Sequence, residues 1–190
     1  MSINKPNKNT DEIPPDEDGE LVRAAQKDPA AFQQLYDRWA VPIYQYFYAR
    51  TGEAANAEDL TSQLFLSVYQ ALPRYQHRGT FAAWLFTIAR NLSRDYYRKL
   101  GREAPLYQAQ QLAADSDLPA EAAQREEIAR LRRLIHSLPD REQELIRLRY
   151  VAGLTFAEMA DVLKKRKDAV KKSLYRLQAR LQGLLEQDHD

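Results

Sequence analysis

Three arginines spaced four residues apart are the feature of this sequence best suited to binding an anion. Arg90, Arg94 and Arg98 lie in the stretch GTFAAWLFTIARNLSRDYYRKL, which spans residues 79–100. On a helix this spacing places the three guanidinium groups about one turn apart on one face. Such a row can bind successive phosphates of a nucleic acid, but it can equally be an ordinary solvated surface. This stretch alone leaves both interpretations open.

The loop before this stretch mixes positive charges with aromatic rings. Its residues, together with a tryptophan in the following helix, are Arg74, Tyr75, His77, Arg78 and Trp84. Single-stranded nucleic acid is bound by this combination, because cations follow its phosphates while rings stack on its unpaired bases. Trp84 also suits a core position, so we expect the rings of Tyr75, Phe86 and Tyr97 to be the more exposed ones.

A second basic cluster lies near the C-terminus. Residues 164–180 contain eight bases and one acid. They follow a short helical pattern and a tight turn, an order typical of a helix-turn-helix, whose second helix enters the major groove. A helix without a polyanionic partner normally mixes its charges, since like charges four residues apart repel. We therefore expect this helix to bind duplex DNA through Arg166, Lys167, Lys171, Lys172 and Arg176.

No arrangement of side chains in the sequence supports catalysis. The three histidines are isolated, cysteine is absent, and the six glycines form no phosphate-binding loop. Glu58 and Asp59 are adjacent and point apart on a helix, so they fit a first-turn position better than acid–base work. We expect no enzyme activity, no metal or other cofactor and no small-molecule substrate. No apolar run resembles a membrane span or signal peptide, so we expect a cytoplasmic protein without membrane insertion.

Helices must position these residues, because period-2 strand patterns are absent and apolar residues recur at helical spacing. The pattern predicts helices beginning near residue 20 and spanning residues 30–50, 57–72, 81–100, 120–137, 140–151, 156–163 and 168–186. Asn56 suits the N-cap of the third helix, and Thr155 with Glu158 forms a capping box. We predict an all-α fold.

Composition divides the chain into four segments. Residues 1–19 are acidic, contain three prolines and hold few apolar side chains, which predicts a disordered tail. Residues 101–119 have the composition of a flexible linker. Between the tail and the linker we predict an N-terminal helical bundle, residues 20–100. After the linker we predict a C-terminal helix-turn-helix domain, residues 120–190. Both predicted domains are basic although the net charge is only +1, which favours a polyanionic partner.

Four segments of the chain form a recognisable set in a fixed order. The most specific is FAAWLFTIARNLSRDYYR, which contains the pattern W-L-x-x-I-A-R-N, and AEDLTSQLF is nearly as specific. AAQKDPAAFQQLYDRW precedes them and LPDREQELIRLRYVAGLTFAEMADVL follows. Over roughly residues 20–186 the chain resembles a bacterial sigma-70 family factor of the extracytoplasmic-function (ECF, group 4) type. It departs from the family pattern where Lys164, Arg166 and Ala169 replace the glycine, serine and threonine of the helix-turn-helix.

The resemblance implies a transcription initiation factor that directs core RNA polymerase to specific promoters and helps to melt the minus-10 region. It implies sigma region 2 for the N-terminal domain and region 4, which reads the minus-35 element, for the C-terminal one. The implied partners are promoter DNA and core RNA polymerase, which would be contacted at its clamp helices and beta flap. The resemblance is also compatible with an anti-sigma factor as a partner. Polymerase binding is implied for Asp59, Gln63, Leu66 and Ser67. Minus-10 single-strand binding is implied for Arg74, Tyr75, His77, Arg78, Trp84, Arg90, Asn91, Arg94 and Arg98.

The residues themselves leave two other classes of protein open. One is a helix-turn-helix transcriptional regulator that acts as a dimer without core polymerase. The other is a helical scaffold that binds only protein, which would show no salt-dependent affinity for DNA.

Overall fold

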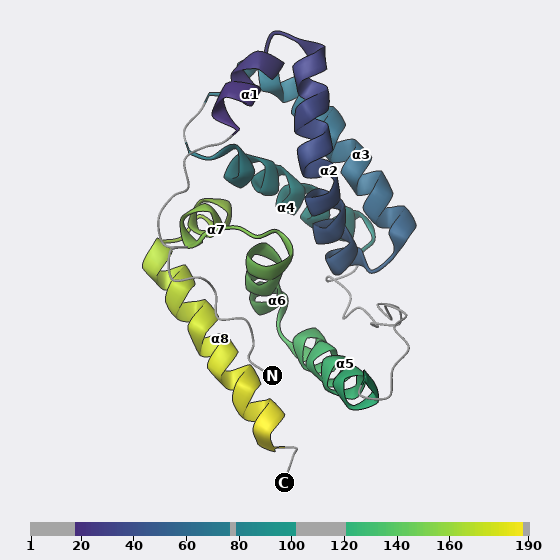
Figure 1. Cartoon of the computed structure of the whole chain (residues 1–190), viewed down its shortest axis with the longest axis vertical. Helices are drawn as coiled ribbons and strands as arrows, with labels where there is room; N and C mark the ends of the chain where they lie inside the picture. The colour runs from purple at the N-terminus through teal and green to yellow at the C-terminus, as the bar shows by residue number, and fades with distance from the viewer. Residues whose placement is uncertain (1–17, 77–78, 102–120, 188–190) are drawn as a thin grey trace.

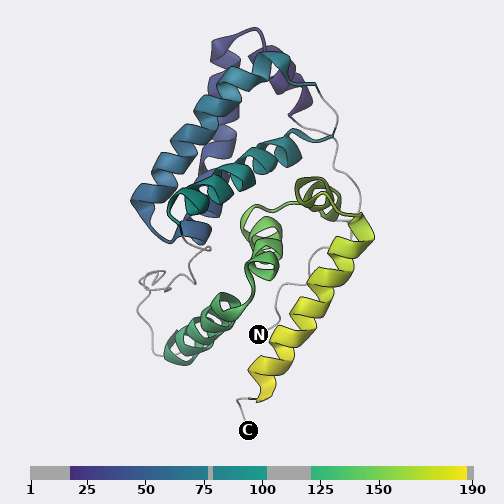
Figure 2. The ribbon, with the colours of Figure 1, turned by 180° about the vertical axis from the view of Figure 1, so that it is seen from behind.

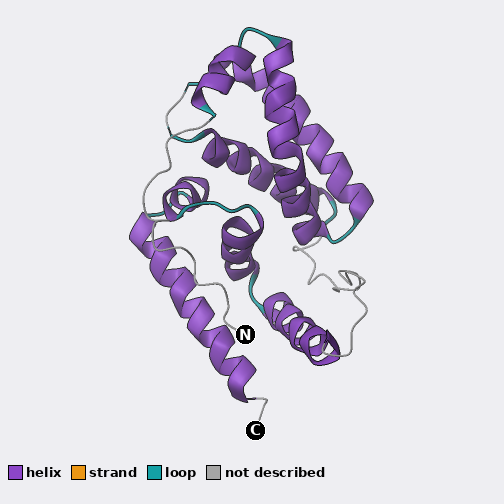
Figure 3. Ribbon diagram, viewed as in Figure 1, coloured by secondary structure: helices purple, strands orange, loops and turns teal. Residues whose placement is uncertain are grey.

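The computed structural model describes residues 18–76, 79–101 and 121–187, and every regular element among them is a helix (Figures 1 and 3). The all-α prediction is confirmed. The elements are α1 (Gly19–Ala25), α2 (Pro29–Thr51), α3 (Ala54–Ala71), the 3₁₀ turn η1 (Leu72–Arg74), α4 (Phe81–Lys99), α5 (Glu121–Ser137), α6 (Asp140–Ile146), the π-helical turn η2 (Arg147–Val151), α7 (Phe156–Leu163) and α8 (Lys167–Gln187). The predicted tail up to residue 17 and the linker from residue 102 to 119 lie outside the described residues. Among the described helices, none is both long and apolar enough to cross a membrane.

Local sequence signals account for the ends of α2 and the start of α3. Asp28 is the N-cap of α2 and accepts a hydrogen bond from the Ala30 amide at 2.9 Å, and Gly52 ends the helix with a φ of 69°. The N-cap prediction for Asn56 is wrong. The chain leaves Gly52 in an extended conformation at Glu53, so α3 begins three residues earlier than expected, at Ala54, and Asn56 lies in its first turn.

Helix α4 buries side chains outside its apolar stripe, which consists of the residues that recur at helical spacing, Phe81, Trp84, Leu85, Ile88, Leu92 and Tyr96. Phe86 is fully buried against Trp39 and Tyr46 of α2, and the Tyr97 hydroxyl donates a 2.7 Å hydrogen bond to the Arg50 carbonyl. The prediction that Phe86 and Tyr97 are exposed is therefore wrong. The reason is that α4 packs on α2, α3 and α7, and that α2 covers both Phe86 and Tyr97.

The helix-turn-helix forms as the sequence predicts. The Thr155 hydroxyl accepts a 3.2 Å hydrogen bond from the Glu158 amide, and the Glu158 carboxylate accepts one of 2.8 Å from the Thr155 amide. This is the predicted capping box. Helix α7 then ends at Lys164, which has a φ of 53° and so occupies the left-handed region that glycine usually fills. The turn thus keeps its geometry although the usual glycine is absent.

Replacing Lys164 with glycine should stabilise the protein. A left-handed conformation costs a residue with a Cβ roughly 1–2 kcal/mol, partly offset by the greater freedom of glycine in the unfolded chain. We expect a net gain of about 1 kcal/mol in the free energy of unfolding, measured by urea denaturation. Ala179→Gly, at an exposed position inside α8, should lower it by about the same amount. A Lys164→Gly protein no more stable than the unmodified chain would contradict the expected strain.

The N-terminal and C-terminal helices share one hydrophobic core. Buried residues of the C-terminal half, among them Leu148, Phe156 and Met159, belong to the same cluster as Ile43 of α2 and Phe86 of α4. Helix α7 packs on α4 and the η2 turn packs on α2, and Figures 1 and 2 show this contact from opposite sides. The two halves are therefore docked against each other.

Candidate nucleic-acid interface

A cavity of about 810 Å³ opens beside the N-terminus of α4. It is lined by residues of α3, η1, the following loop, α4 and α7, namely Gln70, Ala71, Arg74, Tyr75, Gln76, Gly79, Thr80, Ala83, Trp84, Thr87 and Asp161. Three of the residues predicted to bind single-stranded DNA, Arg74, Tyr75 and Trp84, thus lie together around one hollow. His77 and Arg78, from the same prediction, lie outside the described residues.

Aromatic rings form one wall of this cavity. The ring of Tyr75 lies 4.5 Å from that of Trp84, centroid to centroid, at an interplanar angle of 44°. Phe81, which is buried, contacts both rings and fixes them to the core. Because Tyr75 and Trp84 are each only partly buried, they can offer ring surface to a planar ligand. We expected Tyr75 to be the more exposed of the two, but both rings are partly buried.

A residue that the sequence analysis missed holds the loop in position. The side-chain amide of Gln26, just after α1, donates hydrogen bonds to the carbonyls of Leu72 (3.1 Å) and Tyr75 (2.8 Å). These partners lie 46 and 49 residues away along the chain, so no local pattern could reveal them. Gln26 therefore ties α1 to the loop that carries Tyr75.

Gln26→Leu should loosen this loop and weaken single-strand binding. Two hydrogen bonds worth about 1 kcal/mol each are lost, and two partly buried carbonyls remain without them. We expect about a tenfold loss of affinity for single-stranded DNA, measured by fluorescence anisotropy. Gln33→Leu, which removes an exposed amide bonded only within α2, is the matched control and should leave the affinity unchanged. Equal affinities of the two variants would show that Gln26 does not position the loop.

The row of arginines on α4 is not uniform. Arg94 and Asn91 are exposed, and Arg98 forms an exposed ion pair with Asp95 at 3.0 Å. The Arg90 side chain is only 27% exposed, and its Nε lies 3.7 Å from a carboxylate oxygen of Glu144 in α6. One member of the predicted phosphate-binding row is thus already paired with an anion of the same chain.

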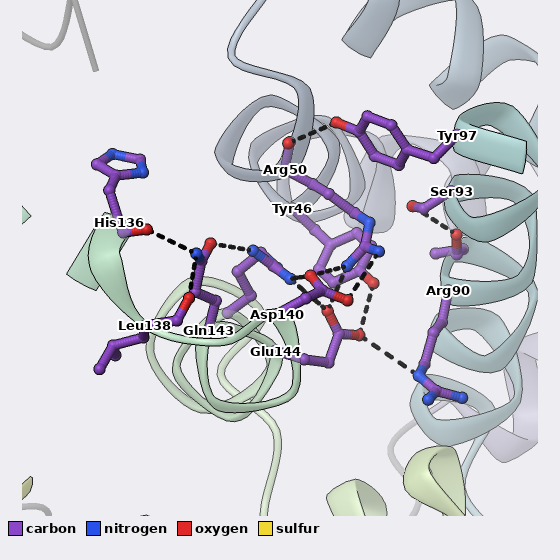
Figure 4. A network of polar contacts seen from close by, with 12 residues as sticks. Tyr46, Arg50, Arg90, Ser93, Tyr97, His136, Leu138, Asp140, Gln143 and Glu144 are labelled. Carbon is purple, nitrogen blue, oxygen red and sulfur yellow. Dashed lines mark hydrogen bonds and ion pairs between the residues drawn. The ribbon is translucent and has the colours of Figure 1, made fainter. Parts of the chain in front are cut away.

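Glu144 is the centre of a polar network between the two halves of the protein (Figure 4). Its carboxylate is buried and accepts hydrogen bonds from Arg50 at 2.9 Å, from the Tyr46 hydroxyl at 2.8 Å and from Arg147 at 3.1 Å. Arg50 and Arg147 also both bind Asp140, at 3.2 and 2.7 Å. Carboxylates of α6 are thus matched to arginines of α2 and of the η2 turn.

Burial and charge alter the acidity of several groups in this network. Burial raises the pKa of Tyr46, and the neighbouring Glu144 carboxylate raises it further, so the phenol stays protonated and acts as a donor. Burial raises the pKa of Tyr97 to about 12. Partial burial opposes ionisation of Asp140, but the charges of Arg50 and Arg147 outweigh it and hold the pKa of Asp140 below its usual value. Asp140 is therefore ionised at neutral pH, whereas the phenols of Tyr46 and Tyr97 keep their protons.

The bases at the start of α8 differ in their exposure. Val170, Leu174 and Leu177 are buried, whereas Arg166, Lys172 and Arg176 are exposed and Lys167 and Lys171 are partly buried. The Lys171 ammonium lies over two rings, 5.8 Å from the centroid of Phe156 and 5.9 Å from that of Tyr175. The predicted minus-35 residues are thus not equally accessible, because Lys171 lies against rings whereas Arg166, Lys172 and Arg176 face solvent.

The residues predicted to bind the polymerase lie on the outer surface of α3. Asp59, Gln63 and Leu66 are exposed, and Ser67 is partly exposed, with its hydroxyl bonded to the Gln63 carbonyl. Leu66 is 59% exposed and the nearby Tyr69 is 50% exposed. These two apolar side chains give the helix a mixed surface suited to a protein partner.

Among the described residues, no group of three or more histidine, aspartate or glutamate side chains is placed to bind a metal ion.

Comparison with known protein families finds two matches in the chain. Residues 35–103 match the model of sigma-70 region 2, and residues 128–181 match that of sigma-70 region 4. The first match contains α4 and all the residues that line the cavity except Asp161, and the second contains Asp161 and the helix-turn-helix up to residue 181.

Several characterised proteins are similar along most of the chain. The ECF RNA polymerase sigma factor BldN of Streptomyces coelicolor is 36% identical over 89% of this chain, which spans 66% of the length of BldN. The corresponding factor SigE of Mycolicibacterium smegmatis is 30% identical, over 88% of this chain and 67% of SigE. The structure of CnrH in complex with the cytosolic domain of CnrY superposes with a TM-score of 0.66 at 28% identity, and the match covers 89% of this chain and 97% of CnrH.

Proposed function

The chain belongs to the ECF sigma factors of the sigma-70 family, and on this basis we propose that it binds core RNA polymerase, directs it to specific promoters and helps to melt their minus-10 region. The observation that carries the proposal is the cavity in the region 2 match, where Tyr75, Trp84 and Arg74 converge. Rings and cations at this spacing bind unpaired bases and phosphates. The proposal involves no catalysis by the chain itself and places it in the cytoplasm.

Each half of the chain has its own part in this function. The exposed side of α3, with Asp59, Gln63 and Leu66, would dock on the clamp helices of the polymerase. The cavity would take a base of the displaced strand, while Arg94 and the other basic side chains of α4 hold its backbone. The exposed bases at the start of α8 would contact the minus-35 element in the major groove, and the region 4 half would also meet the beta flap.

The similarity to CnrH suggests a further partner. CnrH has been solved in complex with the cytosolic domain of CnrY, and it matches this chain in fold and over most of its length. We propose that this chain too binds an anti-sigma factor. We expect such a partner to co-purify with this chain from the bacterium that encodes it. Adding the purified partner to the transcription reaction should then abolish promoter-dependent transcripts.

Run-off transcription with core polymerase tests the proposed function. Purified chain added to core enzyme on a genomic fragment library should give discrete transcripts that core enzyme alone does not produce. Lys172→Ala with Arg176→Ala should remove most of them, because the loss of two phosphate or base contacts weakens duplex binding. An absence of chain-dependent transcripts, combined with binding to a symmetric operator, would instead support a regulator that acts without polymerase.

A further inference from the structure

One acidic residue stands among the exposed bases of α8. Residues 164–180 contain eight bases, and Asp168, in the first turn of the helix, is the single acid among them. Asp168 is exposed, and no hydrogen bond or ion pair joins its carboxylate to another of the described residues. Lys172 lies four residues further along, a spacing that favours an ion pair, but the structure forms none between the two. Asp168 therefore keeps its full capacity to accept hydrogen bonds.

The start of α8 does not need Asp168 as a cap. The amides of Ala169 and Val170 donate hydrogen bonds of 3.0 and 3.1 Å to the Arg166 carbonyl, so the backbone satisfies them. A carboxylate in the first turn also complements the helix dipole. That effect depends on the turn and not on the side of the helix, so it does not explain why the carboxylate lies on the side where it does.

The side of α8 that carries Asp168 faces away from the core. Val170, Leu174 and Leu177 are buried and define the core side. Asp168 and Lys172 are each two residues from Val170, which places both of them about 160° away from it around the helix. Both are exposed. A carboxylate and an ammonium group thus stand one turn apart on the side that the proposed function directs into the major groove.

A carboxylate on a DNA-binding surface has few favourable contacts. Phosphates repel it, because duplex DNA carries about one negative charge per 1.7 Å of its axis. The major groove offers two amino donors, N4 of cytosine and N6 of adenine. The adenine amino group lies beside the N7 acceptor, which repels a carboxylate, whereas N4 is the only hydrogen-bonding group that cytosine presents there. Cytosine is therefore the base that suits a carboxylate best.

Two neighbouring cations offset the repulsion between this carboxylate and the DNA backbone. Arg166 and Lys172 are exposed and flank Asp168 along the chain. They can bind phosphates while Asp168 faces the base edges, and Lys172 can also donate to O6 or N7 of a guanine. An acid between these cations lowers the general affinity for duplex DNA, but it rejects bases that present only acceptors.

We propose that Asp168 is a specificity-determining residue of α8, which selects a cytosine in the duplex site by accepting a hydrogen bond from its N4 amino group. Guanine and thymine at the same position present O6, N7 or O4 to the carboxylate and are rejected. The flanking cations supply affinity, and Asp168 supplies discrimination. This inference rests on the proposed binding of α8 in the major groove.

Selection from a pool of random duplex DNA tests the inference. The full chain is immobilised, mixed with the pool, and the bound duplexes are sequenced. The unmodified chain should enrich a site with one cytosine position, preferred by about tenfold over other bases. Asp168→Asn should change the preference at that position to adenine, because an amide pairs with N6 and N7 of adenine, and should leave the other positions unchanged. Asp168→Ala should lose the preference at that position alone.

Glu186→Gln is the matched control. It makes the same change of charge on the same helix, near the other end, where the Glu186 carboxylate accepts a 3.0 Å hydrogen bond from Gln182. Its selected site should be that of the unmodified chain. Urea denaturation detects a merely structural role. If Asp168 only stabilised the start of α8, Asp168→Asn would unfold at lower urea and would weaken binding to all sequences alike, which would count against base selection.

An Asp168→Asn protein that selects the same base at every position as the unmodified chain would overturn the inference. The same switch in Glu186→Gln would also overturn it, since net charge would then explain the change. The proposed function is judged separately, by transcripts with core polymerase. A chain that gives no such transcripts but changes its selected base on Asp168→Asn would lose the proposed function and keep this inference.

Discussion

Replacement of Trp84 with alanine should slow open-complex formation by about 10- to 100-fold while duplex binding through α8 changes little. Trp84 lines the cavity and lies 4.5 Å from Tyr75, so its ring is placed to stack on an unpaired base. Stacking of one base on an aromatic side chain is worth about 1–3 kcal/mol, which corresponds to this range. Permanganate footprinting measures strand opening. Gel shift of a duplex minus-35 fragment measures duplex binding through α8.

A control must separate loss of stacking from loss of core packing, since Trp84 also contacts the buried Phe81. Trp84→Phe keeps a ring and should retain most of the opening rate. Tyr44→Ala removes a ring that stacks on Tyr48 of α2 at 5.9 Å and does not line the cavity, so opening should be normal. If Tyr44→Ala and Trp84→Ala slowed opening equally, the cavity would have no special role in strand capture.

Arg50→Met should lower the free energy of unfolding by about 3 kcal/mol. The Arg50 side chain is 4% exposed and is bound to both Glu144 and Asp140. Removing one partner of a buried ion pair typically costs about 3–5 kcal/mol, because the remaining charge stays buried without compensation. Here Arg147 still faces Glu144 at 3.0 Å, so we expect the lower end of that range. Urea denaturation followed by circular dichroism measures the loss.

A double-mutant cycle identifies the cause of this loss. Glu144→Met removes the charge that Arg50→Met leaves behind, so the double variant should be more stable than the sum of the two single changes predicts, by at least 1 kcal/mol. Gln143→Met on the same helix provides the comparison, as its amide oxygen binds Arg147 and not Arg50. Strict additivity of Arg50→Met and Glu144→Met would rule out direct coupling between the two charges.

Features set by neighbouring residues could be predicted from the sequence. The capping box of Thr155 and Glu158, the N-cap at Thr80 and the glycine end of α2 each depend on residues within one helical turn. The tight turn before α8 was also predictable, although its left-handed position is filled by Lys164. The family resemblance assigned DNA binding to α4, to the segment before it and to the start of α8, and these assignments stay predictions.

Features set by distant contacts could not be predicted. Arg50 and Glu144 are 94 residues apart, so neither side chain carries a local sign of its partner. Phe86 falls outside the apolar stripe of α4, and only the docking of α2 against that side explains its burial. Arg90 was assigned to DNA on its charge, its spacing and the family resemblance. The structure shows that Arg90 is also paired with the carboxylate of Glu144. This pair depends on packing between the two halves of the chain.

In the π-helical turn η2, the number of residues matters for the fold as much as their side chains do. Arg147, Leu148 and Arg149 are consecutive and all buried in this turn, which holds one more residue than an α-helical turn. Deleting one residue from this turn would restore the α-helical register and rotate everything after it by about 100°. Phe156 would then leave the shared core. Insertions and deletions that a surface loop tolerates should therefore be excluded between residues 147 and 151 by natural selection.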